Sequence, residues 1–446
     1  MDFSWLQEAL PGIMFLFLFA ILLFGYPVAF TLGGVGLYFG LATFGPEFFK
    51  LLPLRYWGRM TNFTLMAVPL FIYMGVMLEK SGIAEELLET MGLLFGKIRG
   101  GLAISVVVVG ALLAASTGIV GASVVTMGLL SLPTMLRRNY SPEMATGVIS
   151  ASGTLGQIIP PSIVLVLLGT IMNVPIGDIF LGAVFPGLLL VVFYIIWILI
   201  IAVIKPESVP PMPDEELREF RGKKAIARVF KVLIPPFFLI IAVLGSIFAG
   251  IASPTEAAGV GALGATILTI CYGKFNFKTL HAVMRSTTFL TSMVFIILLG
   301  ATSFGLVFRG MNGDAFIRGL ITSLPFDKWG ILVIVMGIIF IAGFFLDFIE
   351  ITFIHIPVLA PIMIEHYHVD PLWLAVLIAL NLQTSFLTPP FGFSLFYLKG
   401  VAPPEVTTKH LYKGIIPYVI IQLITIGVVA FFPMIVKFLP EIVFRK

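Results

Sequence analysis

Apolar segments of membrane-spanning length recur along the whole chain, and they constrain its fold more than any other feature. A helix needs about 20 apolar residues to cross the hydrocarbon core of a bilayer. Only 11% of the 446 residues are charged and the mean hydropathy is +1.09, so no sizeable soluble domain fits between the segments. We therefore predict an all-α, multi-pass membrane protein with about ten transmembrane helices, near 8–26, 28–45, 61–79, 143–172, 178–204, 232–250, 254–273, 287–308, 371–398 and 414–438.

Two further apolar regions are interrupted near their middle. Residues 101–136 break at 116–118 into arms of about 15 residues, or about 22 Å of helix, which is shorter than a hydrocarbon core of about 30 Å. Basic residues flank both ends of this region, and basic residues collect on the cytoplasmic side. Residues 329–363 break at 347–350 and lack basic ends. The sequence therefore predicts two re-entrant hairpins, one entering from each side of the membrane.

An internal repeat relates the two hairpins. Adding 229 to the numbers of four prolines, 142, 160, 161 and 175, gives four further prolines, 371, 389, 390 and 404. The stretch SGTLGQIIPPS (152–162) then aligns with NLQTSFLTPPF (381–391). Each half contributes five predicted crossings, and an odd number inverts the second half. We expect inverted repeats at 1–204 and 232–446, joined by a charged cytoplasmic linker at 205–231.

The paired prolines explain why membrane segments are interrupted. Proline has no N–H and clashes with the preceding turn, so Pro160-Pro161 and Pro389-Pro390 release carbonyl groups from helical hydrogen bonding. An unpaired carbonyl in lipid is costly unless protein, water or an ion satisfies it. Carbonyl and hydroxyl oxygens are hard ligands suited to Na⁺, and helix N-termini beside them favour an anionic substrate. Inverted halves with broken helices are typical of secondary transporters whose site lies near the bilayer midplane.

Three stretches resemble the large membrane subunit, DctM type, of tripartite ATP-independent periplasmic (TRAP) transporters. They are GIVGAS at 118–123, the segment 131–169, and TPPFGFSLFYLKG at 388–400. The resemblance covers nearly the whole chain. It implies an elevator-type transporter of the bacterial inner membrane, driven by a Na⁺ gradient, that imports an organic acid such as a C4-dicarboxylate or a sialic acid and uses no organic cofactor.

The resemblance also implies two partners. One is a soluble periplasmic binding protein that delivers the substrate, and the other is a small four-helix membrane subunit. Because the sequence shows no additional four-helix region, we expect that subunit to be a separate chain.

Hydroxyls, carbonyls and one acid at the breaks form two candidate cation sites. The first combines the hairpin residues Ser116, Thr117 and Ser123 with the carbonyls from Gly156 to Pro160 and the neighbouring Ser152 and Thr154. The second combines Asp347 and Thr352 with Thr384, Ser385 and Thr388. An intramembrane carboxylate indicates a functional site by default, and Glu350 is a second candidate there. The alternative is that small residues serve helix packing, that hydroxyls bond to their own helix, and that one acid is solvated at a hairpin tip.

The substrate is expected between the hairpin tips. Candidate ligands are Ser152, Thr154, Gln157 and Ser385, whose hydroxyl and amide groups suit carboxylates and polyols. Arg309 ends a predicted crossing and either guides an anion or the binding protein, or places its cation at the membrane interface. Neither broken helix carries a Lys or Arg at mid-membrane depth.

Other classes of function are disfavoured. No HExxH, GxGD or Ser/His pattern supports an intramembrane enzyme, and sealed hairpins suit alternating access better than a channel. A net charge of +4 is too small to indicate nucleic-acid binding; membrane lipid is the expected surrounding. A Na⁺- or H⁺-coupled anion transporter or antiporter that needs no binding protein remains the alternative, because the same broken-helix physics supports it.

Overall fold

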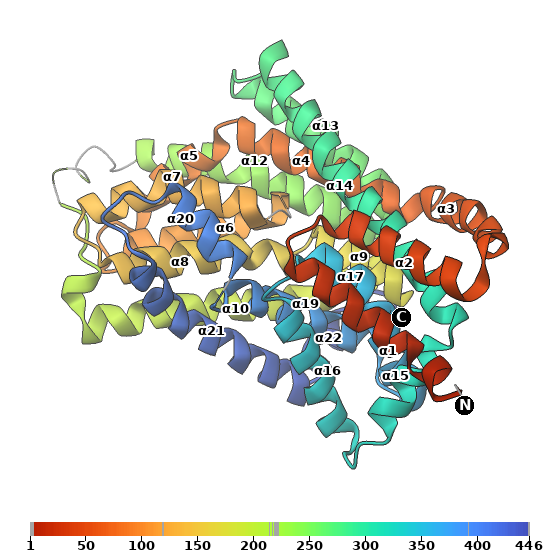
Figure 1. Cartoon of the computed structure of the whole chain (residues 1–446). Helices are drawn as coiled ribbons and strands as arrows, with labels where there is room; N and C mark the ends of the chain where they lie inside the picture. The colour runs from red at the N-terminus through yellow and green to blue at the C-terminus, as the bar shows by residue number, and fades with distance from the viewer. Residues whose placement is uncertain are drawn as a thin grey trace.

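The computed structural model describes residues 4–444 except 118–119, 214, 216, 218–222 and 391. Within these residues the regular secondary structure is helical (Figure 1). The expected all-α fold is confirmed.

Fourteen helical segments precede residue 209 in the described part of the chain. They are α1 (Ser4–Leu23), α2 (Val28–Phe44), η1 (Pro46–Leu51), α3 (Leu52–Met60), η2 (Phe63–Met66), α4 (Ala67–Lys80), α5 (Ile83–Phe95), α6 (Gly101–Thr117), α7 (Val120–Arg137), α8 (Pro142–Thr154), η3 (Leu155–Gln157), α9 (Ile163–Met172), α10 (Ile176–Ile204) and η4 (Pro206–Ser208).

The helices after the linker follow an order similar to that of the helices before it. They are α12 (Lys223–Phe248), α13 (Pro254–Cys271), α14 (Phe277–Gly310), α15 (Gly313–Thr322), α16 (Lys328–Ala342), α17 (Phe348–Ile354), α18 (Ile356–Pro361), η5 (Ile362–His366), α19 (Pro371–Leu387), α20 (Phe393–Val401), α21 (Thr408–Phe431) and α22 (Met434–Phe444).

Seven of the described helices are long and apolar enough to cross a membrane, or eight if the bent pair at 348–366 is one span. This number is lower than the ten predicted crossings, for two reasons. The predicted crossings 143–172 and 371–398 are each broken at their prolines. The first two crossings, 8–26 and 28–45, form apolar helices of the shorter class of 10–17 residues. Six predicted crossings remain, and the seventh long helix is α7, an arm of the predicted first hairpin.

Large apolar side chains on the outer helices face away from the protein. On α13, Val260, Leu263, Ile267 and Ile270 follow one face of the helix and are 50–63% exposed. Such a continuous apolar face is unfavourable in water and is the surface that lipid solvates. The exposed side chains and the long apolar helices together establish a multi-pass membrane protein.

Equivalent caps start the two broken helices. Ser141 Oγ accepts a hydrogen bond from the N–H of Met144 (3.2 Å) at the start of α8. Asp370 Oδ1 accepts one from the N–H of Trp373 (3.0 Å) at the start of α19. A proline occupies the first turn of each helix, where its missing N–H costs nothing. Residue 370 is 141 plus 229, so the repeat extends to the capping chemistry.

Both paired prolines interrupt helices in the structure. After α8 the chain passes through η3 and leaves helical geometry before α9 begins at Ile163. In the second half α19 ends at Leu387 and α20 begins at Phe393. The Pro160-Pro161 and Pro389-Pro390 peptide bonds are both cis.

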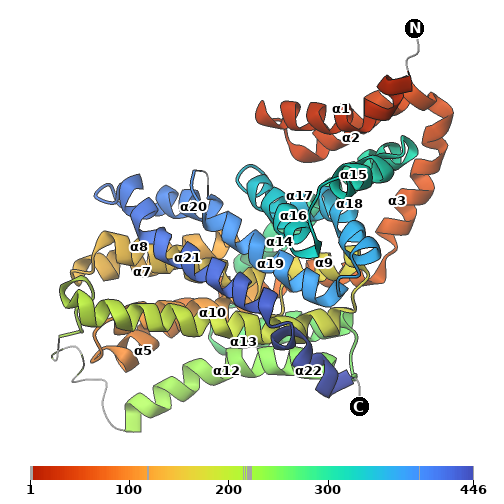
Figure 2. The same cartoon turned by 90° about the horizontal axis from the view of Figure 1, so that it is seen from below.

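The broken helices lie at the centre of the molecule, and each is packed by elements of both halves. Helices α8, α10 and α21 run alongside one another (Figures 1 and 2). The first hairpin, α6 and α7, packs on α8, and α7 also contacts α20 of the second half. In the corresponding contact, α17 and α18 pack against α9 of the first half.

Three boundaries differ from the sequence prediction. The last predicted crossing, 414–438, ends at Phe431, and a separate helix α22 follows it. The second arm of hairpin 329–363 continues to His366 and bends by 43° near His355, where Pro357 cannot donate to the preceding turn. Helix α3, whose apolar and basic residues alternate along a short stretch, was not predicted.

Replacing Gly414 by alanine should destabilise the protein. A Cβ atom at Gly414 would lie 2.1 Å from the carbonyl oxygen of Glu143 on α8, so α8 and α21 would have to separate. Such overpacking costs about 1–3 kcal/mol. The matched control is Gly427→Ala on the same helix, where a Cβ meets nothing within 4 Å and helix propensity gains up to about 1 kcal/mol. Thermal unfolding in detergent measures both variants; equal midpoints would contradict the packing.

Candidate functional site

The first break leaves one backbone carbonyl without its helical donor. In a continuous helix the N–H groups at 160 and 161 would bond the carbonyls of Gly156 and Gln157, but both positions are proline. Ser162 Oγ donates to the carbonyl of Gln157 instead, at 2.9 Å. Because residue 160 is proline, the carbonyl of Gly156 has no N–H donor at that position, and none of the described contacts replaces it.

At the second break, too, two prolines remove donors and one carbonyl regains a donor. Prolines 389 and 390 remove the donors for the carbonyls of Ser385 and Phe386. The N–H of Thr388 bonds the carbonyl of Ser385 at 3.1 Å, which leaves the carbonyl of Phe386. Among the contacts of the described residues, the carbonyls of Gly156 and Phe386 thus lack a replacement for the donor that proline removes.

The two halves meet in a polar contact between repeat-related positions. Gln383 Nε2 donates to Thr154 Oγ1 at 3.4 Å, and 383 is 154 plus 229. Ser394 Oγ donates to the carbonyl of Ser150 at 3.1 Å. The broken helices of the two halves therefore contact each other through polar side chains.

Several polar atoms beside this contact are buried without hydrogen bonds to the described residues. They are Ser150 Oγ, Ser152 Oγ, both amide atoms of Gln157, and Gln383 Oε1. All four side chains have 0% exposure. Buried polar atoms are nearly always satisfied, so such a group indicates a ligand, an ion or water. Two of these residues, Ser152 and Gln157, were predicted from the sequence. Ser150 and Gln383 were not, although Gln383 aligns with the predicted Thr154 in the repeat and could have been found in that way.

The hydroxyls of the second candidate cation site bond to their own helices. Thr352 Oγ1 donates to the carbonyl of Phe348 (2.6 Å), Thr384 to that of Leu380 (2.7 Å), Ser385 to that of Leu382 (2.8 Å) and Thr388 to that of Thr384 (2.8 Å). Thr154 at the first site likewise donates to the carbonyl of Ala151 (2.8 Å). This arrangement uses each hydroxyl proton and leaves the oxygen lone pairs available to a cation.

The hairpins reach the broken helices closely. A Cβ atom on Gly110 of α6 would lie 2.6 Å from Ser152 Cβ, and one on Gly343 would lie 2.1 Å from Ser385 Oγ. Ser123 is 5% exposed on α7. The side chains of Ser116 and Thr117 lie outside the described part of the structure, as do residues 118–119 of the first tip.

Asp347 and Glu350 form a capping box at the start of α17. The Asp347 carboxylate accepts a hydrogen bond from the N–H of Phe348 (2.6 Å), and Glu350 Oε2 accepts one from the N–H of Asp347 (3.0 Å). The acids therefore satisfy helix-terminal donors that lipid cannot. These two bonds engage Asp347 Oδ1 and Glu350 Oε2, and the capping box also brings the Asp347 carboxylate to the N–H of Glu350.

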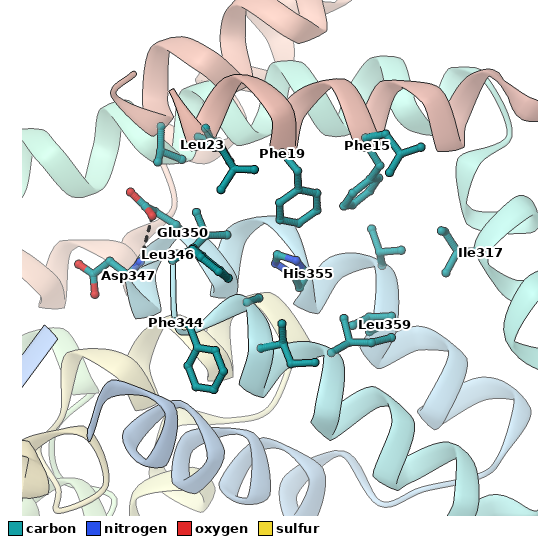
Figure 3. Close-up of a pocket in the computed structure, with 18 of the residues that line it drawn as sticks. Phe15, Phe19, Leu23, Ile317, Phe344, Leu346, Asp347, Glu350, His355 and Leu359 are labelled. Atoms are coloured by element: carbon teal, nitrogen blue, oxygen red, sulfur yellow. Dashed lines mark hydrogen bonds between the residues drawn. The ribbon is translucent and has the colours of Figure 1, made fainter. Parts of the chain in front are cut away.

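A cavity of about 1110 Å³ lies on the other side of this hairpin, between α1 and α16 to α18. Figure 3 shows Phe15, Phe19 and Leu23 of α1 above it and His355 near its middle, with Asp347 and Glu350 at one end. The walls are mostly apolar. His355 was not predicted as a site residue, because nothing in the sequence relates it to the acids.

Arg309 lies apart from these residues. It is at the end of α14 and its Nε is 3.5 Å from Asp314 Oδ2. It lines neither the cavity nor, among the described contacts, the region of the broken helices. Its substrate role therefore receives no geometric support, because an acid of α15 already faces the guanidinium.

Comparison with known proteins identifies the family. The family model described as "Tripartite ATP-independent periplasmic transporter, DctM component" matches residues 15–435. The chain belongs to the DctM family. It is therefore a TRAP transporter permease of the bacterial inner membrane and not an enzyme, which confirms the resemblance, the localisation and the class of function. A tripartite system also implies two further components.

Individual relatives of this DctM-family chain match over most of their length. The C4-dicarboxylate TRAP transporter large permease protein DctM of Pseudomonas aeruginosa is 30% identical, covering 89% of this chain and 91% of the relative. The sialic acid large permease SiaM of Vibrio cholerae is 27% identical (94% and 95% covered). The ectoine large permease TeaC of Halomonas elongata is 30% identical (86% and 87% covered).

A solved structure shares the fold. The YdaH transporter of Alcanivorax borkumensis superposes with a TM-score of 0.59 at 15% identity, covering 88% of this chain and 90% of that one. At this identity the likeness concerns the fold alone.

Replacing Ser162 by alanine should destabilise this DctM-family chain. The change removes the donor that replaces the proline N–H at the carbonyl of Gln157, and an unsatisfied buried carbonyl costs about 1–3 kcal/mol. The control is Ser246→Ala, whose hydroxyl bonds the carbonyl of Val243 (2.8 Å) inside α12, where the helix already supplies a donor. Thermal unfolding should separate the two variants, and an unchanged midpoint for Ser162→Ala would show that another group satisfies Gln157.

Proposed function

We propose that this chain uses a Na⁺ gradient to import a small organic acid across the bacterial inner membrane, by an elevator-type mechanism. The observation that carries the proposal is the group of released carbonyls and unpaired buried polar atoms where the two broken helices meet. In a membrane interior such atoms require a partner. In a permease, two kinds of partner can bind there, a coupling cation and a polar substrate.

Inverted repeats at 1–204 and 232–446 are supported by the element bounds. Adding 229 to α6, 101–117, gives 330–346, beside α16 at 328–342. For α8, 142–154, it gives 371–383, inside α19, and for α10, 176–204, it gives 405–433, beside α21 at 408–431. We propose that the hairpins α6–α7 and α16–α18 are re-entrant and that the linker is cytoplasmic. Helices α5 and α15, which precede the hairpins, would then connect moving and static parts.

Two Na⁺ sites are proposed at the breaks. The first uses the carbonyls near Gly156 and Pro160 with the hydroxyls of hairpin α6–α7, including Ser116, Thr117 and Ser123. The second uses Asp347 with the hydroxyl oxygens of Thr352, Thr384 and Thr388. The first set is neutral and the second carries a carboxylate, so the sites are expected to differ in affinity.

The substrate is proposed to lie between the hairpin tips, at Ser152, Thr154, Gln157 and Ser385. Two of the three relatives named above are permeases for a C4-dicarboxylate and for sialic acid, which favours an organic acid here. Segments 142–172 and 371–398 contain no Lys or Arg. Amide and hydroxyl groups, helix N-termini and neighbouring Na⁺ would therefore hold the carboxylate.

The proposed partners are a periplasmic binding protein that delivers the acid and a small four-helix membrane subunit on a separate chain. Uptake by reconstituted vesicles tests both coupling and delivery. With an imposed Na⁺ gradient, uptake of a labelled organic acid should require the cognate binding protein and should stop when Na⁺ is replaced by K⁺. Equal uptake without the binding protein would favour a self-sufficient anion transporter, and indifference to Na⁺ would remove both cation sites.

Replacing Asp347 by asparagine should raise the Na⁺ concentration for half-maximal uptake by about tenfold or more, since one lost charge-assisted ligand costs about 1.5–3 kcal/mol. Asparagine is as good an N-cap as aspartate, so α17 should remain intact. The control is Asp327→Asn, because Asp327 caps α16 in an exposed position by accepting from the N–H of Gly330 (2.9 Å). An unchanged Na⁺ dependence in Asp347→Asn would exclude the carboxylate as a ligand.

A further inference from the structure

The cavity beside the second hairpin lies apart from the proposed substrate ligands, although Asp347 of the second proposed Na⁺ site is at its end. Its walls come mainly from α1, α15 and the outer side of α16 to α18, with Val28 of α2 and Phe393 and Phe396 of α20. The tip of the same hairpin contacts Ser385 of α19 on its inner side. The unpaired polar atoms at the broken helices do not line it.

The cavity is apolar along its length and acidic at one end. Phenylalanine, leucine and isoleucine side chains make most of its walls, and Asp347 and Glu350 end it (Figure 3). No Lys or Arg is among the described residues that line it. An apolar cavity with two carboxylates and no fixed cation complements a molecule with an apolar body and one positive group.

His355 is a third polar group in the cavity. His355 is 4% exposed and its Nδ1 has no hydrogen bond to the described residues. The rings of Phe19 and Phe15 lie 5.7 Å and 6.3 Å from the imidazole and cannot satisfy that nitrogen. The imidazole is therefore a polar group in the apolar wall of the cavity, with one nitrogen unpaired among the described residues.

We propose that this cavity binds an amphiphilic organic cation, an apolar chain or ring bearing a protonated amine. The ammonium lies at Glu350 and Asp347 and donates to their carboxylate oxygens, while the apolar body lies between α1 and α16. An organic anion is excluded by the two acids, and a plain hydrocarbon chain leaves the carboxylates unpaired. Because the ligand would contact α1 and hairpin α16–α18 at once, its binding opposes movement of one against the other.

Equilibrium dialysis of the purified full chain in lipid nanodiscs tests the site. Labelled octylammonium should bind saturably at about one molecule per chain above empty nanodiscs. Octyltrimethylammonium, which has no N–H, should bind more weakly, and octanol and octyl sulfate should show no saturable binding. The measurement needs no Na⁺ gradient and no binding protein, so its outcome is separate from that of the uptake experiment.

Three variants make the test specific. Glu350→Gln should weaken octylammonium binding about tenfold, since a charge-assisted hydrogen bond is lost, while glutamine still completes the capping box and preserves α17. Ile338→Trp should weaken binding by filling the apolar part without changing charge. Glu365→Gln, which removes an exposed carboxylate paired with Arg318 (3.2 Å) on the far end of the hairpin, should leave binding unchanged.

Two results would overturn the proposal. Saturable octanol binding as tight as that of octylammonium would make the cavity a site for neutral lipid chains. Equal octylammonium affinity in the original chain and in Glu350→Gln would show that the acids do not select the ligand.

Discussion

The need to satisfy backbone carbonyls away from water governs the centre of this molecule. Paired prolines remove two consecutive donors from each broken helix. One carbonyl at each break recovers a donor within the protein, from Ser162 Oγ or from the N–H of Thr388. Buried polar side chains without partners among the described residues, Ser150, Ser152, Gln157 and Gln383, lie on the same helices as these breaks.

Close packing keeps this polar region in place. Glycines on α21 and on both hairpins allow backbones and side chains to approach where no larger residue fits, as is usual when lipid supplies no hydrophobic force between helices. The cross-contacts of α7 with α20 and of α17 with α9 then connect each hairpin to the broken helix of the other half. A movement of either hairpin would therefore displace residues of both halves.

The second hairpin separates two environments. Its inner side contacts the hydroxyl-rich α19, and its outer side faces an apolar cavity that ends at the same pair of acids. The capping box explains how two carboxylates are accommodated at this depth, because the exposed N–H groups at the start of α17 need acceptors.

The sequence by itself determined the membrane class, the family, the positions of both helix breaks and the correspondence of the two halves, because these depend on local composition and on proline chemistry. It also located Gln157 and Ser152, which the structure shows as unpaired buried groups. Only the tertiary structure decided that Thr154 meets Gln383, that Asp314 faces Arg309, that α22 follows α21 as a separate helix, and that His355 lines a cavity with two acids. Those features depend on contacts between segments far apart in the chain, and the period of a single helix carries no information about which side chains of another helix it will face.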